Sequence, residues 1–494
     1  MKIGIIGAGI GGLTAACLLA AEGHEVVLWE KNHTVGGKMN QKVLGGYRFD
    51  TGPSLFTMPD ILRSVFEVCD RKMEDYLSIT PVEPVCRYFW RDGTVFDCST
   101  NIPVTLENMR KFAPEDTEAY VSFLGYSADI YRKTSNTFLF NPLQQFKDLK
   151  DVKKSDIFKI DAFSSVSTKV DKYFKSPYIR QFFKRFTTYN GSSPYIAPAT
   201  LNVIPYVELC LGGFYVNGGL YKIATSLEKL ARELGVVFEF GKCVKEISST
   251  KKKAERVIFE DGSEVNIDVL FSNSDATHTY TELLSDATVK PRSKQQLRDI
   301  EPSCSGFVLL LGVNKTFKQL KHHSIFFSDD YENEFRELFI KKRPSESPTI
   351  YIANTSYSDK EHAVKGGSNL FILVNTPYLT KETIWTEEYS KKYGDLIISI
   401  LEDEGLTGLK DSIEERVHIT PQDFYDVYLS NKGSIYGTSS NLPTSAFMRP
   451  RNKSPYLDNL YLAGGSTHPG GGIPLVVLSA KHAVSLFKRD QVGK

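Results

Sequence analysis

Four segments follow one another near the start of the chain: Lys2-Ile-Gly-Ile-Ile6, Gly7-Ala-Gly-Ile-Gly-Gly12, Leu13-Thr-Ala-Ala-Cys-Leu-Leu-Ala-Ala21 and Glu25-Val-Val-Leu-Trp-Glu30. The first is an apolar run typical of a buried parallel strand, and the second fits the pattern G-x-G-x-x-G. The third is rich in Ala and Leu, as in a helix, and the fourth is a second strand that ends on an acid. This order, with the acid about twenty residues after the glycines, predicts a βαβ dinucleotide-binding unit.

The residue types of this unit fit the chemistry of a dinucleotide. Gly7 permits a tight turn, Gly9 lets the backbone approach a pyrophosphate, and Gly12 lets the helix pack closely on the sheet. The helix start offers N–H groups to the phosphates, and the Glu30 carboxylate can accept the ribose hydroxyls. We predict these cofactor-binding residues in the unit: Gly7, Gly9, Ile10, Gly11, Gly12 and Glu30.

The next segments carry a family resemblance. A doublet with a basic residue, Gly36-Gly37-Lys38, is followed by Phe49-Asp-Thr-Gly-Pro-Ser54. This pattern resembles the FAD superfamily of amine oxidases, protoporphyrinogen oxidases and carotenoid desaturases. The resemblance implies that the glycine doublet lies against the diphosphate-ribose part of FAD. It extends the predicted cofactor-binding residues to Lys31, Gly37, Lys38, Gly52, Pro53 and Ser54.

A second glycine-rich turn lies near the C-terminus. The segment Asn459-Leu-Tyr-Leu-Ala-Gly-Gly465 predicts a strand that ends in glycines, and the run from Leu475 to Lys488 has the apolar periodicity of a helix. Between them stands Ser466-Thr-His-Pro-Gly-Gly-Gly-Ile-Pro474. Glycines and a proline at a helix start predict a site for a flavin carbonyl, with a plain surface loop as the alternative.

The C-terminal stretch resembles the signature of bacterial-type phytoene and carotenoid desaturases. Further segments agree, so that the resemblance covers nearly the whole chain and is loose only over about 100–200: 213–219, 272–284, 322–331, 420–437 and 449–450. The hydroxycarotenoid 3,4-desaturases look most similar, while desaturases of phytoene or its C30 analogue remain alternatives. The resemblance implies further contacts with FAD from Val244, beside the adenine, and from Asn273, Gly465, Gly472, Ile473 and Pro474.

The positions of these motifs predict an α/β fold with a discontinuous Rossmann-type FAD-binding domain, made of 1–74, 212–285 and 450–494. Residues 75–211 and 286–449 are then expected to form an α+β substrate-binding domain with a mixed or antiparallel sheet. Within it, Val85 to Phe96 predicts a β-hairpin around Asp92-Gly93. Residues 307–312 and 370–376 predict strands, and 105–211 a mainly helical lid.

A basic, aromatic stretch lies inside this helical part. Residues 141–190 hold eleven Lys or Arg and five Asp, with aromatic residues between them. Ser176-Pro177 predicts a helix start that would place Phe182, Phe183 and Phe186 on one side. Our hypothesis is a membrane-contact surface through which a lipid-dissolved substrate enters. The alternative is that the rings belong to the core and the lysines to a solvated face.

The resemblance implies a reaction that removes a hydride, to flavin N5, and a proton from adjacent carbons of a long polyene. The expected reaction is 3,4-desaturation of a 1-hydroxycarotenoid such as 1'-hydroxy-γ-carotene. His468 is the one ionisable side chain in the flavin-side motif and is our candidate catalytic residue, although it can equally serve the glycine loop. His322 and His323 lie in a family segment and are expected to be structural. With one dinucleotide fingerprint, we expect no NAD(P)H site, and the resemblance implies a quinone or dioxygen as electron acceptor.

Composition limits the other function classes. A formal net charge of +1 gives no indication of nucleic-acid binding. The seven cysteines are scattered without metal-ligand spacing, which predicts no metal site and a reducing compartment. No apolar run reaches the roughly 18 residues of a membrane span, so we expect a cytoplasmic protein on the inner face of a membrane. The alternatives are another flavin amine-oxidase-type enzyme and a non-catalytic escort protein that shares the fold.

Overall fold

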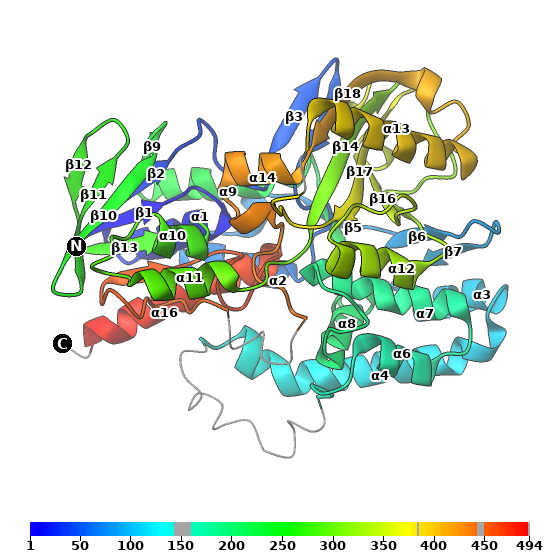
Figure 1. Ribbon diagram of the computed structural model, residues 1–494, viewed down its shortest axis with the longest axis horizontal. Helices are drawn as coiled ribbons and strands as arrows, with labels where there is room; N and C mark the ends of the chain where they lie inside the picture. Colours follow the sequence, from blue (N-terminus) through cyan, green and yellow to red (C-terminus); the bar gives the residue numbers. More distant parts are fainter. Residues whose placement is uncertain (143–159, 383–384, 442–448, 493–494) are drawn as a thin grey trace.

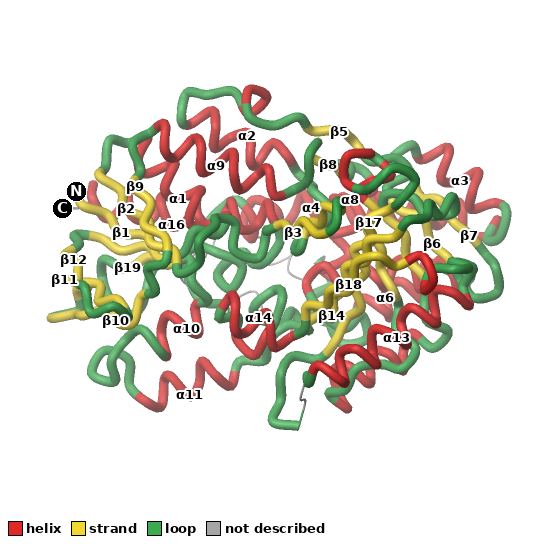
Figure 2. Tube along the Cα trace, turned by 90° about the horizontal axis from the view of Figure 1, so that it is seen from above, coloured by secondary structure: helices red, strands yellow, loops and turns green. Residues whose placement is uncertain are grey.

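Two bodies lie side by side in the molecule, a parallel-sheet body and a body built on a larger sheet with helices below it (Figure 1). The structure, a computed structural model, describes residues 1–142, 160–382, 385–441 and 449–492. Both ends of the described chain lie at the outer edge of the first body, as Figures 1 and 2 agree.

The first body is built on a five-stranded parallel sheet in the order β19-β13-β1-β2-β9. Its strands come from all three segments that the motifs assign to a cofactor domain, while the exact domain boundaries stay a prediction. The strands are β1 (Lys2–Ile6), β2 (Glu25–Glu30), β9 (Val237–Phe240), β13 (Val269–Ser272) and β19 (Leu460–Leu462). The predicted strand, helix, strand and acid of residues 2–30 are confirmed.

Both faces of the parallel sheet are covered, as buried parallel strands require. One face packs on helices, and Ile3, Ile5 and Leu28 belong to that core. The other face, with Trp29, packs on a three-stranded antiparallel sheet and a short helix. Gly4 makes room there, because a Cβ at this position would lie 2.4 Å from the Trp29 ring. The covering elements are α1 (Ile10–Ala21), α2 (Pro59–Val68), α9 (Tyr221–Glu233), α16 (Ile473–Val492), β10 (Val244–Thr250), β11 (Lys253–Phe259), β12 (Glu264–Asn266) and α10 (Ala276–Thr281), with α11 (Pro291–Asp299) beside α10.

The second body is built on a seven-stranded mixed sheet in the order β18-β14-β17-β16-β15-β6-β7, in which only β15 and β6 pair in parallel. The predicted hairpin is confirmed as β6 and β7, and the predicted strands 307–312 and 370–376 as the antiparallel pair β14 and β17. The strands are β6 (Cys86–Phe89), β7 (Val95–Cys98), β14 (Ser305–Val313), β15 (His323–Phe326), β16 (Ile350–Asn354), β17 (Ser368–Thr376) and β18 (Ile413–Ile419). Helices α12 (Tyr331–Arg336), α13 (Glu387–Asp403) and α14 (Pro421–Tyr428) accompany it. Two short ribbons complete the strands: β3 (Gln41–Leu44) with β4 (Tyr47–Asp50), and β5 (Ile79–Pro81) with β8 (Phe214–Val216).

A helical layer lies below the larger sheet and has its own aromatic core (Figure 1). Its elements are α3 (Ile102–Arg110), α4 (Thr117–Thr134), α6 (Val166–Tyr173), α7 (Pro177–Lys184) and α8 (Val203–Leu209). The helix predicted from Pro177 is confirmed as α7. Ser176 is its N-cap residue, but the hydroxyl makes no capping bond. The Asp116 carboxylate instead accepts the backbone N–H groups of Lys175 and Ser176.

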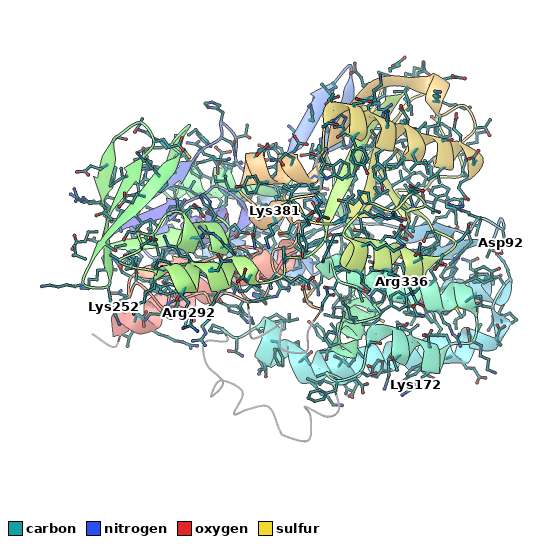
Figure 3. All side chains as sticks on the ribbon, in the orientation of Figure 1. Asp92, Lys172, Lys252, Arg292, Arg336 and Lys381 are labelled. Atoms are coloured by element: carbon teal, nitrogen blue, oxygen red, sulfur yellow. The ribbon has the colours of Figure 1, made fainter. Side chains whose placement is uncertain are left out.

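The predicted membrane role of the aromatic stripe on α7 is wrong. Phe182, Phe183 and Phe186 are buried in the core of the helical layer, and Phe183 stacks on Phe174 at a centroid distance of 4.7 Å. Packing against α4 and α6 removes these rings from any outer surface, while basic side chains such as Lys172 project outward from the layer (Figure 3). The alternative of core rings beside solvated lysines is therefore the observed one. Residues 143–159 of the same basic stretch lie outside the described residues.

None of the helices in the described ranges combines the length and apolarity needed to cross a membrane.

Burial of the stripe predicts a large stability effect. We expect Phe183→Ala to destabilise the protein by about 3–5 kcal/mol, because it removes a fully buried ring and leaves a cavity. The matched control is Phe163→Ala, since the Phe163 side chain is exposed and its removal should change stability by about 0.5 kcal/mol or less. Thermal unfolding followed by intrinsic fluorescence compares the two variants. Equal melting temperatures would contradict the core assignment.

Candidate functional site

A cavity of about 900 Å³ lies where the two bodies meet. Its walls come from the ends of the parallel strands, from the second glycine-rich turn and from the face of the larger sheet. One continuous space therefore connects the predicted dinucleotide unit with the predicted substrate-binding domain. Its volume lies at the upper end of the range for ligand sites.

The glycine turn of residues 7–12 has the local geometry that its sequence predicts. Gly7 has a φ of +92°, and it lines the cavity together with Gly9 and Ile10. Helix α1 begins at Ile10 without a side-chain cap and without an acid in its first turn, so its first N–H groups are available to an anion. Gly12 lies behind the turn, where a Cβ would be only 2.0 Å from the Gly7 carbonyl oxygen.

The Asn273 side chain joins three distant segments beside this turn. Its Nδ2 donates to the Ala463 carbonyl oxygen at 2.8 Å. A Cβ on Gly9, Gly11 or Gly464 would lie 2.6 to 2.7 Å from the Asn273 side-chain oxygen or nitrogen. The glycines therefore let the α1 turn, the end of β13 and the end of β19 close around one amide. Gly11, predicted as a cofactor contact, lies in this joint and is not among the residues that line the cavity.

Glu30 is buried at the end of β2 and lines the cavity. Its Oε2 accepts the Ala8 N–H at 2.8 Å, and its Oε1 accepts the backbone N–H of Asn32 at 2.9 Å and the Asn32 amide at 2.8 Å. A carboxylate has about four acceptor sites, so one stays available for a ribose hydroxyl. The bonds also hold the carboxylate in place, which reduces the ordering cost of binding.

The Gly36-Gly37-Lys38 segment returns to the same cavity. Gly36 and Gly37 both have positive φ, and a Cβ on Gly37 would lie 3.3 Å from the Gly9 Cα. Lys38 is half-buried, and its ammonium donates to the Ser434 and Ile435 carbonyl oxygens, each at 3.1 Å. Burial lowers the pKa of Lys38 to about 8, although the nearby Asp275 carboxylate acts in the opposite direction.

A structural ion pair, Arg48 with Asp50, lies at the start of the Phe49-to-Ser54 segment, next to the cavity. Arg48 and Asp50 form a buried bidentate pair at 2.6 and 2.7 Å. Asp50 also accepts the N–H groups of Leu220 and Tyr221 at the start of α9. Asp50 therefore ties the loop to the parallel-sheet body, while the following predicted residues Gly52, Pro53 and Ser54 line the cavity.

The remaining predicted cofactor residues either support the cavity from behind or line it. Gly12 lies behind the turn as described, and Lys31 donates through its ammonium to the Asp426 carbonyl oxygen at 3.0 Å. Lys31 also lines the cavity, as do the remaining predicted residues: Gly37, Lys38, Val244, Asn273, Gly465, Gly472, Ile473 and Pro474.

His468 is buried beside the second glycine-rich turn, where it lines the cavity and stacks on His482. Its Nε2 lies 3.1 Å from the Asn141 carbonyl oxygen. Because a carbonyl only accepts, Nε2 carries the hydrogen and Nδ1 is left as an acceptor when the ring is neutral. Burial, with a further contribution from His482, lowers the pKa of His468 to about 3, so the ring is neutral at physiological pH.

Arg449 belongs to a predicted family segment but was not predicted as a site residue. Its guanidinium is buried, lines the cavity and lies next to Gly470, where a Cβ would be 2.9 Å from Nη1. Nη2 donates to Ser440 at 3.0 Å, while Nη1 has no hydrogen-bond partner within the described parts of the chain. Burial lowers the pKa of Arg449 to about 10. A buried cation that has no carboxylate beside it among the described residues favours a bound anionic or electron-rich group, and the residues present therefore fit a flavin dinucleotide.

His322 and His323 occupy the wall of the larger sheet. His323 Nδ1 lies 2.7 Å from the Tyr351 hydroxyl, which in turn lies 2.6 Å from Ser54 Oγ. His322 Nδ1 pairs with Ser358 Oγ at 2.7 Å. Burial lowers the pKa of both rings, that of His322 to about 4. Among the described residues, no three His, Cys, Asp or Glu side chains are arranged to hold a metal ion.

The close packing of Gly12 leads to a prediction about cofactor content. We expect Gly12→Ala to lose most of the bound flavin, because the methyl group displaces the turn and even a misfit of about 1.4 kcal/mol weakens binding about tenfold. The matched control is Gly125→Ala in α4, where a Cβ meets nothing within 4 Å and alanine favours the helix. The visible flavin absorbance per polypeptide measures the difference. Full flavin content in both variants would contradict the assignment of this turn.

Solved structures share the fold over almost the full chain. An oxidoreductase from Methanosarcina mazei aligns with a TM-score of 0.66 and 15% identity, covering 99% of this chain and 100% of that chain. A redesigned putrescine oxidase aligns with a TM-score of 0.66 and 13% identity, covering 99% of each chain. A Rab GDI from Plasmodium falciparum aligns with a TM-score of 0.57 and 11% identity over 98% of this chain. At these identities the likeness shows the fold alone, and it confirms the predicted class.

Sequence relatives are much closer. A 1-hydroxycarotenoid 3,4-desaturase from a Flavobacterium species is 36% identical over 496 residues, covering 98% of each chain. A 4,4'-diapolycopene oxygenase from a Methylomonas species is 36% identical over 482 residues, or 97% of this chain and 96% of that one. A 4,4'-diaponeurosporene oxygenase from Staphylococcus haemolyticus is 35% identical over 484 residues, or 97% and 95%.

The family model for flavin containing amine oxidoreductases matches residues 10–486. This match begins at the first residue of α1 and spans both bodies and most of α16, so it includes most of the cavity walls described above. The predicted superfamily, the oxidoreductase class and the FAD cofactor are confirmed. The chain therefore belongs to the flavin-containing amine oxidoreductase family, on the branch of the carotenoid desaturases and oxygenases, and its cofactor is FAD.

Proposed function

We propose that the protein is a carotenoid desaturase that removes a hydride and a proton from adjacent carbons of a long polyene, with 3,4-desaturation of a 1-hydroxycarotenoid such as 1'-hydroxy-γ-carotene as its reaction. The observation that carries the proposal is the single cavity that joins the cofactor cradle to the larger sheet. Its substrate-side wall is apolar over much of its length, as a polyene requires. That wall includes Val207, Val308, Ile325, Phe371, Leu373 and Ile435.

The division of labour follows from the cavity. Bound FAD supplies the chemistry of accepting two electrons with a hydride. The protein's own residues orient the polyene along the sheet and limit its contact with water, because the named side chains of that wall are apolar and are buried or half-buried. Arg449 adds a buried positive charge beside the Thr467-to-Gly472 turn, which favours negative charge at that end of the cavity.

The released proton needs only a weak acceptor. Positive charge left on a polyene is spread over its conjugated bonds, which lowers the demand for a strong base near the reacting carbons. His468 offers a neutral Nδ1 acceptor at the cavity wall, and its catalytic role stays part of the proposal. A His468→Ala protein with full flavin content and normal turnover would remove that role.

The electron acceptor is part of the proposal too. With one dinucleotide fingerprint in the chain, we propose that a quinone or dioxygen, rather than NAD(P)⁺, reoxidises the flavin. A second candidate reaction is oxygenation of a polyene end, which the names of two similar proteins favour. Desaturation of phytoene or diapophytoene is the third.

The proposal predicts one productive class of substrate. The protein would be expressed in cells that accumulate phytoene, lycopene, γ-carotene or their 1-hydroxy derivatives. The absorption spectra and molecular masses of the pigments would then be measured. We expect a red shift with the loss of two hydrogens only from the hydroxylated carotenoids. A gain of oxygen would support the oxygenase instead, and a coloured product from phytoene would move the reaction to an earlier step. Flavin-loaded protein that changes none of them would contradict the proposal.

We further propose that the protein lies on the inner face of a membrane, from which a lipid-dissolved substrate enters. Support comes from Phe163, which lines the cavity and is 78% exposed, so the cavity reaches the surface at an apolar side chain. Phe163 follows residues 143–159 in the chain, and Phe140, which precedes them, is exposed as well. All seven cysteines are free thiols, in keeping with a reducing compartment.

This location leads to a binding prediction. We expect Phe163→Ser to weaken co-sedimentation with anionic liposomes, because it removes the aromatic contact with the acyl region. Val121→Ser, which removes an exposed apolar side chain from α4 at a residue that is not in the cavity wall, is the matched control and should bind like the wild type. Equal binding by all three proteins would count against Phe163 as the contact, and absence of binding by the wild type would contradict the membrane proposal.

A further inference from the structure

A charged cluster interrupts the otherwise apolar substrate side of the cavity. Arg185 follows α7, Glu208 lies in α8, and both line the cavity together with Tyr189. Arg185 Nη2 donates to Glu208 Oε1 at 2.6 Å, and the two side chains are only 7% and 2% exposed. The Tyr189 hydroxyl donates to the other Glu208 oxygen. A hydrocarbon substrate gives this pair nothing to bind, while its burial has a desolvation cost.

The cluster also has unused hydrogen-bonding capacity. Arg185 Nε and His323 Nε2 are buried and have no hydrogen-bond partner in the described ranges, and both residues line the cavity. A neutral His323 whose Nδ1 accepts from the Tyr351 hydroxyl carries its hydrogen on Nε2. Unsatisfied buried donors are rare in folded proteins, and two of them in residues that line one cavity, beside a buried ion pair, point to a polar ligand group at this wall.

Hydrogen bonds connect His323, which lines the same cavity as the ion pair, to the cofactor side. Tyr351 bonds to His323 and also to Ser54, which lies in the loop predicted to contact FAD. A polar group held here is therefore close to the carbons that react. In 3,4-desaturation of a 1-hydroxycarotenoid, the carbon that bears the hydroxyl is two carbons from the nearer reacting carbon. In the substrate, too, the polar group therefore lies close to the carbons that react.

We propose that Arg185, Glu208 and His323 bind the oxygen of a hydroxylated end group and thereby select which end of the polyene reaches the flavin. A tertiary hydroxyl has one donor and two acceptor sites, which match the Glu208 carboxylate and the N–H groups of Arg185 and His323. The inference rests on the proposed desaturase function and names the specificity-determining residues of that same site.

The test measures kcat/KM on two polyenes that differ only in the 1-hydroxyl, with purified flavin-loaded protein. The main variant is Arg185→Met/Glu208→Leu, in which apolar side chains of similar size replace the pair and neither charge is left alone. We expect kcat/KM for the hydroxylated polyene to fall on the order of 10- to 100-fold, mainly through KM, while the hydrocarbon reacts as before or faster.

The control is Tyr88→Phe. Tyr88 also accepts a hydrogen bond from Arg185, but it is not among the residues that line the cavity, so its hydroxyl should not affect the preference. If the double variant loses its flavin, His323→Phe, which removes a donor and keeps a ring, carries the same comparison and the same expectation.

Each outcome decides between the proposals. Equal losses on both polyenes at full flavin content, or an unchanged preference in the variants, would overturn the end-group site. Wild-type protein that converts both polyenes equally well would overturn it and leave the desaturase function standing. Wild-type protein that is loaded with flavin and converts neither polyene would overturn both proposals.

Discussion

The amide of Asn273 is the joint on which the cofactor site depends. It lies between the α1 turn, the end of β13 and the end of β19, and it bonds to the Ala463 carbonyl oxygen. Around it, Gly9, Gly11 and Gly464 leave no room for a Cβ. Three segments separated by about 260 and about 190 residues therefore meet at one backbone-lined wall, with Glu30 and the start of α1 beside it. The cavity has its cofactor end only because these segments close tightly.

Electrostatics differs between the two ends of the cavity. On the cofactor side, the helix start presents uncapped N–H groups, and Arg449 adds a buried positive charge. On the substrate side, the walls are apolar and the histidines are held neutral by burial. The Arg185–Glu208 pair is the exception, and it lines the same cavity as His323, which is linked through Tyr351 to Ser54. This pattern suits a long apolar molecule with one polar end.

Much of this arrangement could be predicted from the sequence. The residue 2–30 unit, the β6–β7 hairpin and the start of α7 have local signals, such as an apolar run, a turn dipeptide or a proline at a helix start, and these depend on few neighbours. The stripe of Phe182, Phe183 and Phe186 is different, because its amphipathic pattern shows that one face is apolar without showing what covers it. Packing against α4 and α6 decides that, and it makes the stripe a core. Arg449 was missed for a related reason, since a single arginine before a proline carries no signal of burial.

The sequence by itself determined the dinucleotide unit and the family, because glycines at fixed spacing, a following acid and a helix start define both the local backbone and the chemistry that it serves. Tertiary structure alone decided which of the predicted residues line the cavity and which support it, as with Gly12 behind the turn and Gly11 beside the Asn273 amide. It also brought Arg185, Glu208 and His323 from three elements to one wall. Such groups meet through the folding of distant segments onto one another, and no periodicity or spacing along the chain encodes that meeting.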